Sequence, residues 1–262
     1  MDMSIRVVVT GSKGRMGQEA VKMVMADPEL ELVAEVGSPR SGGEGASFSG
    51  VPFLTSLEEA LLAYKPDVLV DLTTPHVVKS HMELAILHGV RPVVGTTGLS
   101  TEDIEELDKL CREKGVGAII APNFAIGAIL MMKFAREAAR YMPHVEIIEL
   151  HHDKKLDAPS GTAVKTAELI QQTRQELKQG HPDEEEIIDG ARGGYYHGFR
   201  IHSVRLPGLV AHQEVLFGHV GQTLSIRHDS MNRESFMPGI NLGIKKVLKL
   251  DRLVYGLENV MD

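Results

Sequence analysis

Residues 5–17 read I-R-V-V-V-T-G-S-K-G-R-M-G, and this stretch decides the fold of the first half of the chain. The apolar run Ile5–Thr10 predicts a buried strand, and a helical pattern follows from Met16 to Met25 before Pro28 ends it. Three glycines lie in the turn between strand and helix. A strand that passes through a glycine turn directly into a helix is typical of a parallel α/β sheet.

The spacing of these glycines, G-x-x-G-x-x-G, is a variant of the dinucleotide-binding fingerprint. Gly11 would permit the tight turn, Gly14 would let the backbone approach a pyrophosphate, and Gly17 would let the helix pack closely on the strand. A plain glycine loop is the alternative, and Arg15 could equally be a solvated residue. The strand-turn-helix context favours a dinucleotide, so the predicted cofactor contacts here are Gly11, Ser12, Lys13, Gly14, Arg15, Met16 and Gly17.

Strand and helix patterns continue to alternate along the first half of the chain. We expect strands at residues 68–72, 91–95 and 117–121, and helices at residues 76–87 and 101–113. This alternation predicts a Rossmann-type parallel sheet with helices on both faces. Ligands of such sheets bind beyond the carboxyl ends of the strands, where the loops 95–98 and 121–124 emerge.

The second strand, residues 31–36, ends without the acidic residue that normally binds the ribose 2′-hydroxyl of NAD. Gly37 stands at that place, and the nearest acid, Glu35, comes two residues earlier. Ser38 and Arg40 follow closely and could accommodate a 2′-phosphate, so both are predicted cofactor contacts. We therefore expect NADPH to be used at least as well as NADH.

A second stretch, residues 146–163, reads E-I-I-E-L-H-H-D-K-K-L-D-A-P-S-G-T-A and joins a strand to a helix. His151 and Lys155 can each donate a proton near neutral pH, the lysine if burial lowers its pKa. Ser160 is expected to cap the helix, and the amides of Gly161 and Thr162 would form an anion site for a carboxylate. The alternative is an ordinary strand end with solvated lysines. The density of donors beside a helix start favours a functional site.

The run H-H-D-K-K-L-D-A-P-S-G-T-A closely resembles the signature of the bacterial dihydrodipicolinate reductases of diaminopimelate and lysine biosynthesis. The resemblance implies that NADPH or NADH reduces a small cyclic dicarboxylate, 4-hydroxy-tetrahydrodipicolinate, to tetrahydrodipicolinate with loss of water. It makes His151 and Lys155 the catalytic pair, with either one as the proton donor. The carboxylates of the substrate would be bound by His152, Ser160, Gly161 and Thr162.

The resemblance also extends to the nicotinamide end of the cofactor and to the assembly. Two loops match segments that line the nicotinamide in this family, and they predict contacts from Gly95, Thr96, Thr97, Ala121, Asn123 and Phe124. A glycine-threonine turn and a Pro-Asn helix entry are the plain alternatives for these loops. The family further implies a homotetramer formed through the second domain.

The second half predicts another α+β domain with a mixed, largely antiparallel sheet. We expect helices at residues 127–141, 161–177 and 232–250, and strands at residues 145–150, 199–205, 209–217 and 223–227. Residues 1–126 with 233–262 would form the dinucleotide-binding domain, and residues 127–232 would bind substrate and oligomerise. The chain would cross between the domains twice, which predicts a hinge and closure over the substrate.

Composition excludes several classes of protein. A chain of 262 residues with 43% hydrophobic content can form two domains, and a net charge of −8 argues against a nucleic-acid partner. One cysteine allows no intrachain disulfide, and no apolar run reaches the roughly 20 residues of a membrane span. The start of the chain has no signal-peptide pattern, so we expect a cytoplasmic protein. The 12 histidines show no metal-ligand spacing, which predicts no metal site.

Two other functions fit parts of these patterns. An amino-acid dehydrogenase of related layout would share the cofactor domain, but its substrates are not cyclic imines and suit the signature run less well. A noncatalytic dinucleotide-sensing protein would use the second domain only for assembly. The dense histidine and lysine cluster beside an anion site weighs against that alternative.

Overall fold

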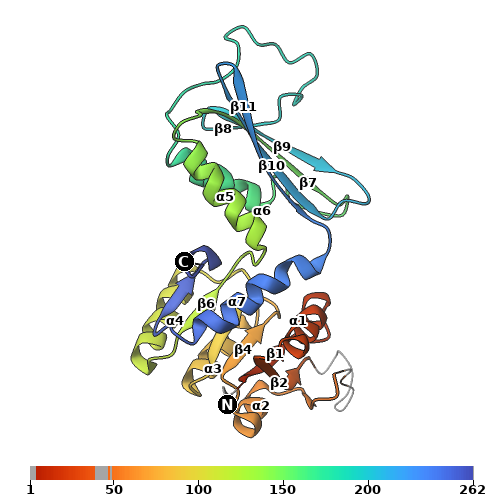
Figure 1. The fold of residues 1–262 in the computed structure, drawn as a ribbon, viewed down its shortest axis with the longest axis vertical. Helices are drawn as coiled ribbons and strands as arrows, with labels where there is room; N and C mark the ends of the chain where they lie inside the picture. The colour runs from red at the N-terminus through yellow and green to blue at the C-terminus, as the bar shows by residue number, and fades with distance from the viewer. Residues whose placement is uncertain (1–3, 39–46, 48, 262) are drawn as a thin grey trace. The chain divides into compact units, whose positions relative to one another are not determined.

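The computed structural model describes residues 4–38, 47 and 49–261. The chain divides into two compact units (Figure 1). The first comprises Met1–Phe124 together with Phe236–Asp262, and the second comprises Ala125–Ser235. Within the described residues, no helix combines the length and the apolar character that a membrane crossing requires.

The first unit is built on a seven-stranded parallel sheet of strand order β12-β6-β5-β4-β1-β2-β3 (Figure 1). Its strands are β1 (Ile5–Thr10), β2 (Leu30–Val36), β3 (Phe53–Leu54), β4 (Val68–Asp71), β5 (Arg91–Val94), β6 (Ala118–Ile120) and β12 (Leu253–Tyr255). From β1 the chain adds β2 and β3 on one side of the sheet, and then continues with β4 on the other side of β1. The carboxyl ends of β1 and β4 therefore form a topological switch point. The expected Rossmann-type sheet is confirmed.

Helices cover both faces of this sheet, as the sequence predicted. They are α1 (Arg15–Ala26), α2 (Leu57–Tyr64), α3 (Val78–Leu87), α4 (Thr101–Lys114) and α7 (Met237–Val247), followed by the 3-10 turn η3 (Leu257–Asn259). Another 3-10 turn, η2 (Arg233–Phe236), lies where the chain passes from the second unit to the first. Helices α1 and α7 lie against one face, and α2, α3 and α4 lie against the other. Both faces of each central strand are therefore buried, which explains the continuous apolar runs in the sequence.

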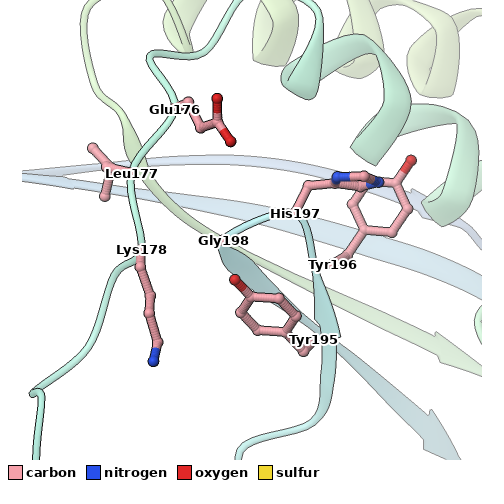
Figure 2. A pocket seen from close by; sticks show the side chains of 7 residues that line it. All are labelled: Glu176, Leu177, Lys178, Tyr195, Tyr196, His197 and Gly198. Carbon is pink, nitrogen blue, oxygen red and sulfur yellow. The ribbon is translucent and has the colours of Figure 1, made fainter.

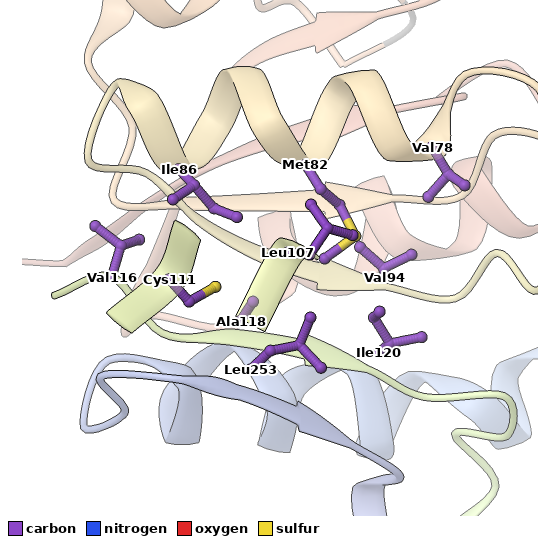
Figure 3. Packing of buried hydrophobic residues seen from close by; sticks show 10 residues of the cluster. All are labelled: Val78, Met82, Ile86, Val94, Leu107, Cys111, Val116, Ala118, Ile120 and Leu253. Atoms are coloured by element: carbon purple, nitrogen blue, oxygen red, sulfur yellow. The ribbon is translucent and has the colours of Figure 1, made fainter. Parts of the chain in front are cut away.

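Among the described residues, the core beneath α3 and α4 contains a cluster of ten buried hydrophobic residues. Met82, Leu107 and Val94 are almost fully buried, and their side chains point toward one another in Figure 3. Cys111 lies in the same cluster, where burial raises the pKa of its thiol to about 12. Cys111 is thus a packing residue, as expected from its place on the helix.

The second unit is a five-stranded sheet of strand order β11-β10-β7-β9-β8, covered by two helices. Its elements are α5 (Ile126–Ala138), β7 (His144–His151), α6 (Gly161–Gln171), β8 (Gly194–Tyr196), β9 (Phe199–Arg205), β10 (Ala211–His219) and β11 (Gln222–Ser230). Only the β7–β9 pair is parallel, so the expectation of a mixed, largely antiparallel sheet is confirmed. Val145 and Ile147 of β7 are buried on the face that α5 and α6 cover.

Several boundaries differ from those expected. The helix predicted to reach Leu177 ends at Gln171, because the buried guanidinium of Arg174 draws the following chain into another path. Its three nitrogens donate hydrogen bonds to the carbonyl oxygens of Pro143, His197, Leu177 and Gly198. Helix α2 and the strands β3, β8 and β12 were not predicted, and each of these strands is too short to carry a periodic pattern.

Helix α7 returns to the first unit and is fastened to the end of α1. Asn241 Nδ2 donates to Asp27 Oδ2 at 2.6 Å, and Lys245 Nζ lies 3.0 Å from the same oxygen. Lys245 also pairs with Glu29. The hydrogen bonds from Asn241, from the Glu29 amide and from Lys245 hold the pKa of Asp27 at about 2, below its ordinary value of 3.8. An ionised Asp27 therefore stabilises the docking of a segment more than 200 residues away.

Substitution Asp27→Asn is expected to lower the free energy of unfolding of this unit by about 2 kcal/mol near neutral pH, because a charged hydrogen-bond acceptor is lost. The lowered pKa means that the stabilisation is complete above pH 3.8 and disappears as the pH falls through about 2. The difference between wild type and variant in urea unfolding should shrink across that range. Asp251→Asn, at an exposed position, is the control. A difference that is independent of pH would contradict this account.

Candidate functional site

The glycine turn after β1 is shaped by close backbone contacts. Gly11 has a positive φ of 72°, and a Cβ there would lie 2.6 Å from the carbonyl oxygen of Leu72. A Cβ on Gly17 would lie 2.1 Å from the carbonyl oxygen of Gly11, so α1 can approach the turn only if residue 17 has no side chain. Gly14 has an ordinary φ of −71° and is exposed. The tight turn expected at Gly11 and the close packing expected at Gly17 are therefore both present.

The start of α1 provides donors that suit an anion. Gly14 is the N-cap of α1, and within the described chain no side chain caps the first turn. The hydroxyl of Ser12 is fully buried and has no hydrogen-bond partner among the described residues. Backbone amides at a helix N-terminus and an unpartnered hydroxyl fit a pyrophosphate. Of the two predicted cations, Lys13 lies over the Phe53 ring at 3.9 Å from its centroid, and Arg15 is exposed.

A cavity of about 310 Å³ opens beyond the carboxyl ends of β1, β4 and β5. It is lined by Met16, Leu72, Thr73, Pro75, Gly95, Thr96 and Thr97. Four of these residues are predicted cofactor contacts: Met16 from the first turn of α1, and Gly95, Thr96 and Thr97 from the loop after β5. The structure thus brings together two segments that are far apart in sequence. A Cβ on Gly95 would meet Leu72 Cδ2 at 2.8 Å and Phe124 Cε2 at 3.2 Å, so this position also requires a small residue for packing.

A buried carboxylate, which was not predicted from the sequence, lies behind two residues of the cavity wall. Asp71 ends β4 with no exposed surface, and the imidazole Nδ1 of His81 donates to its Oδ2 at 2.7 Å. The hydroxyls of Thr10, Thr73 and Thr96 also donate to this carboxylate. Burial alone would raise the pKa of Asp71, but the hydrogen bonds from His81 and Thr73 outweigh it and keep the pKa below its ordinary value. The sequence signal that could have identified Asp71 is its position at the end of an otherwise apolar strand.

The predicted cofactor contacts of the loop after β6 differ in their burial. Ala121 and Phe124 are buried, and the carbonyl oxygen of Phe124 would lie 2.0 Å from a Cβ on Gly239 of α7. Phe124 therefore has a packing role in addition to the contact predicted for it. Asn123 is half-buried.

The adenosine end of the predicted site is only partly described. Ser38 is exposed, and Arg40 lies outside the described residues. Glu35 is fully buried and accepts hydrogen bonds from the hydroxyls of Ser47 and Ser49. Both hydroxyls contact Oε1, and the buried Oε2 has no hydrogen-bond partner among the described residues.

The second predicted site begins where β7 ends. His151 is the last residue of β7, and its Nδ1 lies 2.5 Å from Oε2 of Glu149, a fully buried residue. Two nitrogens of Arg205 contact the same carboxylate, with Nη1 3.0 Å from Oε2 and Nη2 2.7 Å from Oε1. Burial opposes ionisation of Glu149, but hydrogen bonds from His151 and Arg205 outweigh it and lower its pKa to about 2. Sequence reasoning missed both Glu149 and Arg205.

The turn that follows holds the remaining predicted residues. Lys155 Nζ lies 2.7 Å from Asp157 Oδ1, and His152 is exposed. Ser160 is buried and caps α6 as predicted, since its hydroxyl accepts from the Ala163 amide at 3.3 Å. Apart from its chain neighbours and the backbone of its own helix, no described atom lies within 4 Å of the place that a Cβ of Gly161 would occupy. The glycine there is not required by packing, and the residue is exposed.

A larger hollow of about 500 Å³ lies elsewhere in the second unit (Figure 2). It is lined by Glu176, Leu177, Lys178, Tyr195, Tyr196, His197 and Gly198. None of the residues predicted to bind substrate or cofactor lines it. Volume alone therefore does not identify the site of this protein.

Comparisons with known proteins agree across the whole chain. The family model described as "Dihydrodipicolinate reductase, N-terminus" matches residues 5–124, and "Dihydrodipicolinate reductase, C-terminus" matches residues 127–261. The chain is 63% identical over 263 residues to the 4-hydroxy-tetrahydrodipicolinate reductase of Halalkalibacterium halodurans, covering 98% of this chain and 100% of the relative. It is 57% identical over 263 residues to the reductase of that name from Bacillus subtilis, covering 99% and 98%.

A solved structure supports the same assignment. Dipicolinate-bound dihydrodipicolinate reductase from Paenisporosarcina sp. TG-14 is 52% identical and superposes with a TM-score of 0.92. The match covers 99% of this chain and 100% of the other.

The two glycines Gly14 and Gly17 offer a matched pair of substitutions. Gly17→Ala should destabilise the first unit, because its Cβ would lie 2.1 Å from a carbonyl oxygen of the turn. A Cβ on Gly14 would lie 3.1 Å from the carbonyl oxygen of Gly11, which requires only a small shift of the turn, so Gly14→Ala should fold with a much smaller loss of stability, yet its methyl group would obstruct an approaching pyrophosphate. We expect the thermal midpoint to fall more for Gly17→Ala than for Gly14→Ala, and dinucleotide affinity, measured by calorimetry, to fall roughly 10-fold or more for Gly14→Ala. Unchanged affinity in a folded Gly14→Ala protein would remove the turn from the cofactor site.

Proposed function

The chain belongs to the dihydrodipicolinate reductase family, and from this we propose that residues 151–162 bind and protonate its substrate. The activity is the NAD(P)H-dependent reduction of 4-hydroxy-tetrahydrodipicolinate in diaminopimelate and lysine biosynthesis. One hydride and one proton are consumed, and one water is released. The amino-acid dehydrogenase and the noncatalytic sensor are not favoured, because named reductases match almost the full chain.

The first unit fits the cofactor. The glycine turn, the uncapped start of α1 and the unpartnered hydroxyl of Ser12 would hold the pyrophosphate. The cavity beyond β4 and β5 would take the nicotinamide end against Thr96, Thr97 and Met16. NAD(P)H supplies the hydride when it is bound there. Asp71 does not reach this cavity itself, but its hydrogen bonds fix the rotamers of Thr73 and Thr96 in the cavity wall.

The substrate class rests on the chemistry of the turn after β7 and on the Paenisporosarcina relative, which was solved with dipicolinate bound. A carboxylate is bound by backbone amides and by side chains that donate hydrogen bonds, and the start of α6 with His152 and Lys155 offers both. The observation that carries this proposal is the open space at Gly161, the exposed first residue of α6, because a ligand needs room at the start of the helix.

His151 and Lys155 are the two proton donors of this turn. Reduction places negative charge on the ring of the substrate, and a nearby acid group lowers the barrier by donating a proton as that charge develops. Each of the two side chains is held by a carboxylate, His151 by Glu149 and Lys155 by Asp157. Either side chain could deliver the proton.

The remaining assignments concern the whole molecule. We assign dinucleotide binding to residues 1–126 with 233–262, and substrate binding and oligomerisation to residues 127–232. One face of the second sheet carries α5 and α6, and the other would be covered by further copies of the chain in a homotetramer. A biosynthetic enzyme that uses NAD(P)H belongs in the cytoplasm.

The proposed activity is tested by following NAD(P)H absorbance with the product of the preceding pathway enzyme as substrate. Replacement of His151 or Lys155 by alanine should lower kcat by roughly 100-fold or more, the lower end of general acid catalysis. The neighbouring exposed Lys154→Ala serves as the control and should keep its activity. If kcat is retained when both side chains are removed, they are not the catalytic pair.

Substitution Gly161→Ala probes the anion site without disturbing the fold. Its Cβ meets no described atom, and alanine is favoured over glycine in a helix, so the thermal midpoint should not fall. The methyl group would instead occupy the space through which a carboxylate reaches the amide. We expect KM for the dicarboxylate to rise roughly 10-fold or more, while KM for NAD(P)H stays constant. Gly218→Ala, whose Cβ would meet only His144 Cβ at 3.9 Å, is the control, and equal behaviour of the two variants would contradict the proposal.

A further inference from the structure

We propose that Glu149 and Arg205 are positioning residues of the reductase: Glu149 fixes the imidazole of His151, and Arg205 ties Glu149 to the turn that holds Lys155. The inference rests on the catalytic role proposed for His151 and Lys155. It adds two residues that touch neither substrate nor cofactor but act through the groups that do.

Glu149 determines which nitrogen of His151 is available for chemistry. The two residues alternate onto the same face of β7, and the carboxylate Oε2 lies 2.5 Å from Nδ1. The pKa of Glu149, lowered to about 2, keeps the carboxylate ionised, and an ionised carboxylate only accepts hydrogen bonds. Nδ1 must therefore carry the proton of the neutral ring. Nε2 is left as the nitrogen that can exchange a proton with a substrate.

Arg205 completes the surroundings of this carboxylate. It lies beside His151 in the register of the parallel pair β7–β9, and its two terminal nitrogens bind one oxygen of Glu149 each. Two neutral residues also adjoin this carboxylate: the Ser203 hydroxyl donates to Glu149, and Gln213 lies opposite it on β10. A buried carboxylate with one fixed cation and one imidazole is both ionised and immobile.

The same guanidinium reaches the turn that carries the second proton donor. Arg205 Nη2 donates to the backbone carbonyl oxygen of Asp157 at 2.7 Å, and the Asp157 carboxylate lies 2.7 Å from Lys155 Nζ. Arg205 thus contacts both acids that hold the catalytic side chains. Polar contacts run from His151 through Glu149 and Arg205 to the backbone of Asp157, whose side chain contacts Lys155. Their consequence is a fixed spacing between the two proton donors.

A purely structural role is the alternative, in which Arg205 simply neutralises a buried acid. The strand offers a matched control for that alternative. Glu146 lies on the opposite face of β7 and also contacts one arginine and one histidine, Arg192 and His202. Glu146→Gln breaks a similar network on the same strand without touching the proposed catalytic pair.

The test compares Glu149→Gln, Glu149→Asp and Glu146→Gln in the full-length protein. The tautomer of His151 is read from ¹⁵N imidazole spectra, with its signal assigned by comparison with His151→Ala. In wild type we expect the proton on Nδ1, and in Glu149→Gln a mixture of tautomers. We expect kcat to fall roughly 10- to 100-fold in Glu149→Gln, with KM for NAD(P)H unchanged and partial recovery in Glu149→Asp.

The tautomer of His151 distinguishes a positioning role of Glu149 from a structural one. Glu149→Gln removes the charged acceptor that holds the proton on Nδ1, whereas a structural defect would lower kcat without changing the tautomer. Arg205→Lys should lower kcat yet keep the Nδ1 tautomer, because an ammonium leaves Glu149 ionised but cannot reproduce the two-nitrogen contact of Arg205 with both oxygens of the carboxylate.

Three results would overturn the inference: an unchanged tautomer and kcat in Glu149→Gln, equal losses in Glu149→Gln and Glu146→Gln, or unchanged kcat in Arg205→Lys. Failure of the proposed function is distinguishable from all three. It would appear as retained activity in the variants of His151 and Lys155 themselves, whatever the tautomer in Glu149→Gln.

Discussion

Each unit of the structure contains a buried carboxylate that a histidine contacts near the carboxyl end of a central strand, Asp71 in β4 and Glu149 in β7. Removing a charge from water costs several kcal/mol unless hydrogen bonds replace its hydration. Both residues meet this requirement with a histidine, and each adds partners from distant segments. Because every partner must be in place for the charge to be tolerated, the carboxylates fix the loops on which the proposed cofactor and catalytic residues lie. The polar groups that stabilise each unit are therefore the same groups that shape its site.

The sequence predicted the parts of the fold that depend on local patterns. Apolar runs of strand length, helical periodicity and the glycine spacing each follow from the chain within one turn or strand, and the two sheets were expected on that basis. Ser160 was recognised as a helix cap because capping needs only a hydroxyl three residues before an amide. Gly17 was recognised because its close contact is made with a residue in the same turn.

What could not be predicted depends on contacts between distant residues. Glu149 looks like one more polar residue in an alternating strand until β9 brings Arg205 beside it. The true end of α6 is set by Arg174, whose acceptors come from three separate segments of the chain. Strands of two or three residues, such as β3 and β12, exist only because a longer neighbour supplies their hydrogen bonds. No local sequence pattern predicts any of these long-range contacts.

The two helix starts that face the proposed ligands differ in a way that matches the charge each would bind. At α1 the N-cap is Gly14, and within the described chain no side chain occupies the amides of the first turn. At α6 Ser160 uses its own hydroxyl to satisfy the amide of Ala163, which reduces the donors left to a ligand. A pyrophosphate carries more charge and more acceptor oxygens than a single carboxylate and benefits from every amide of the turn. A glycine cap therefore suits the dinucleotide, whereas a serine cap supplemented by His152 and Lys155 suits one carboxylate of a small ring.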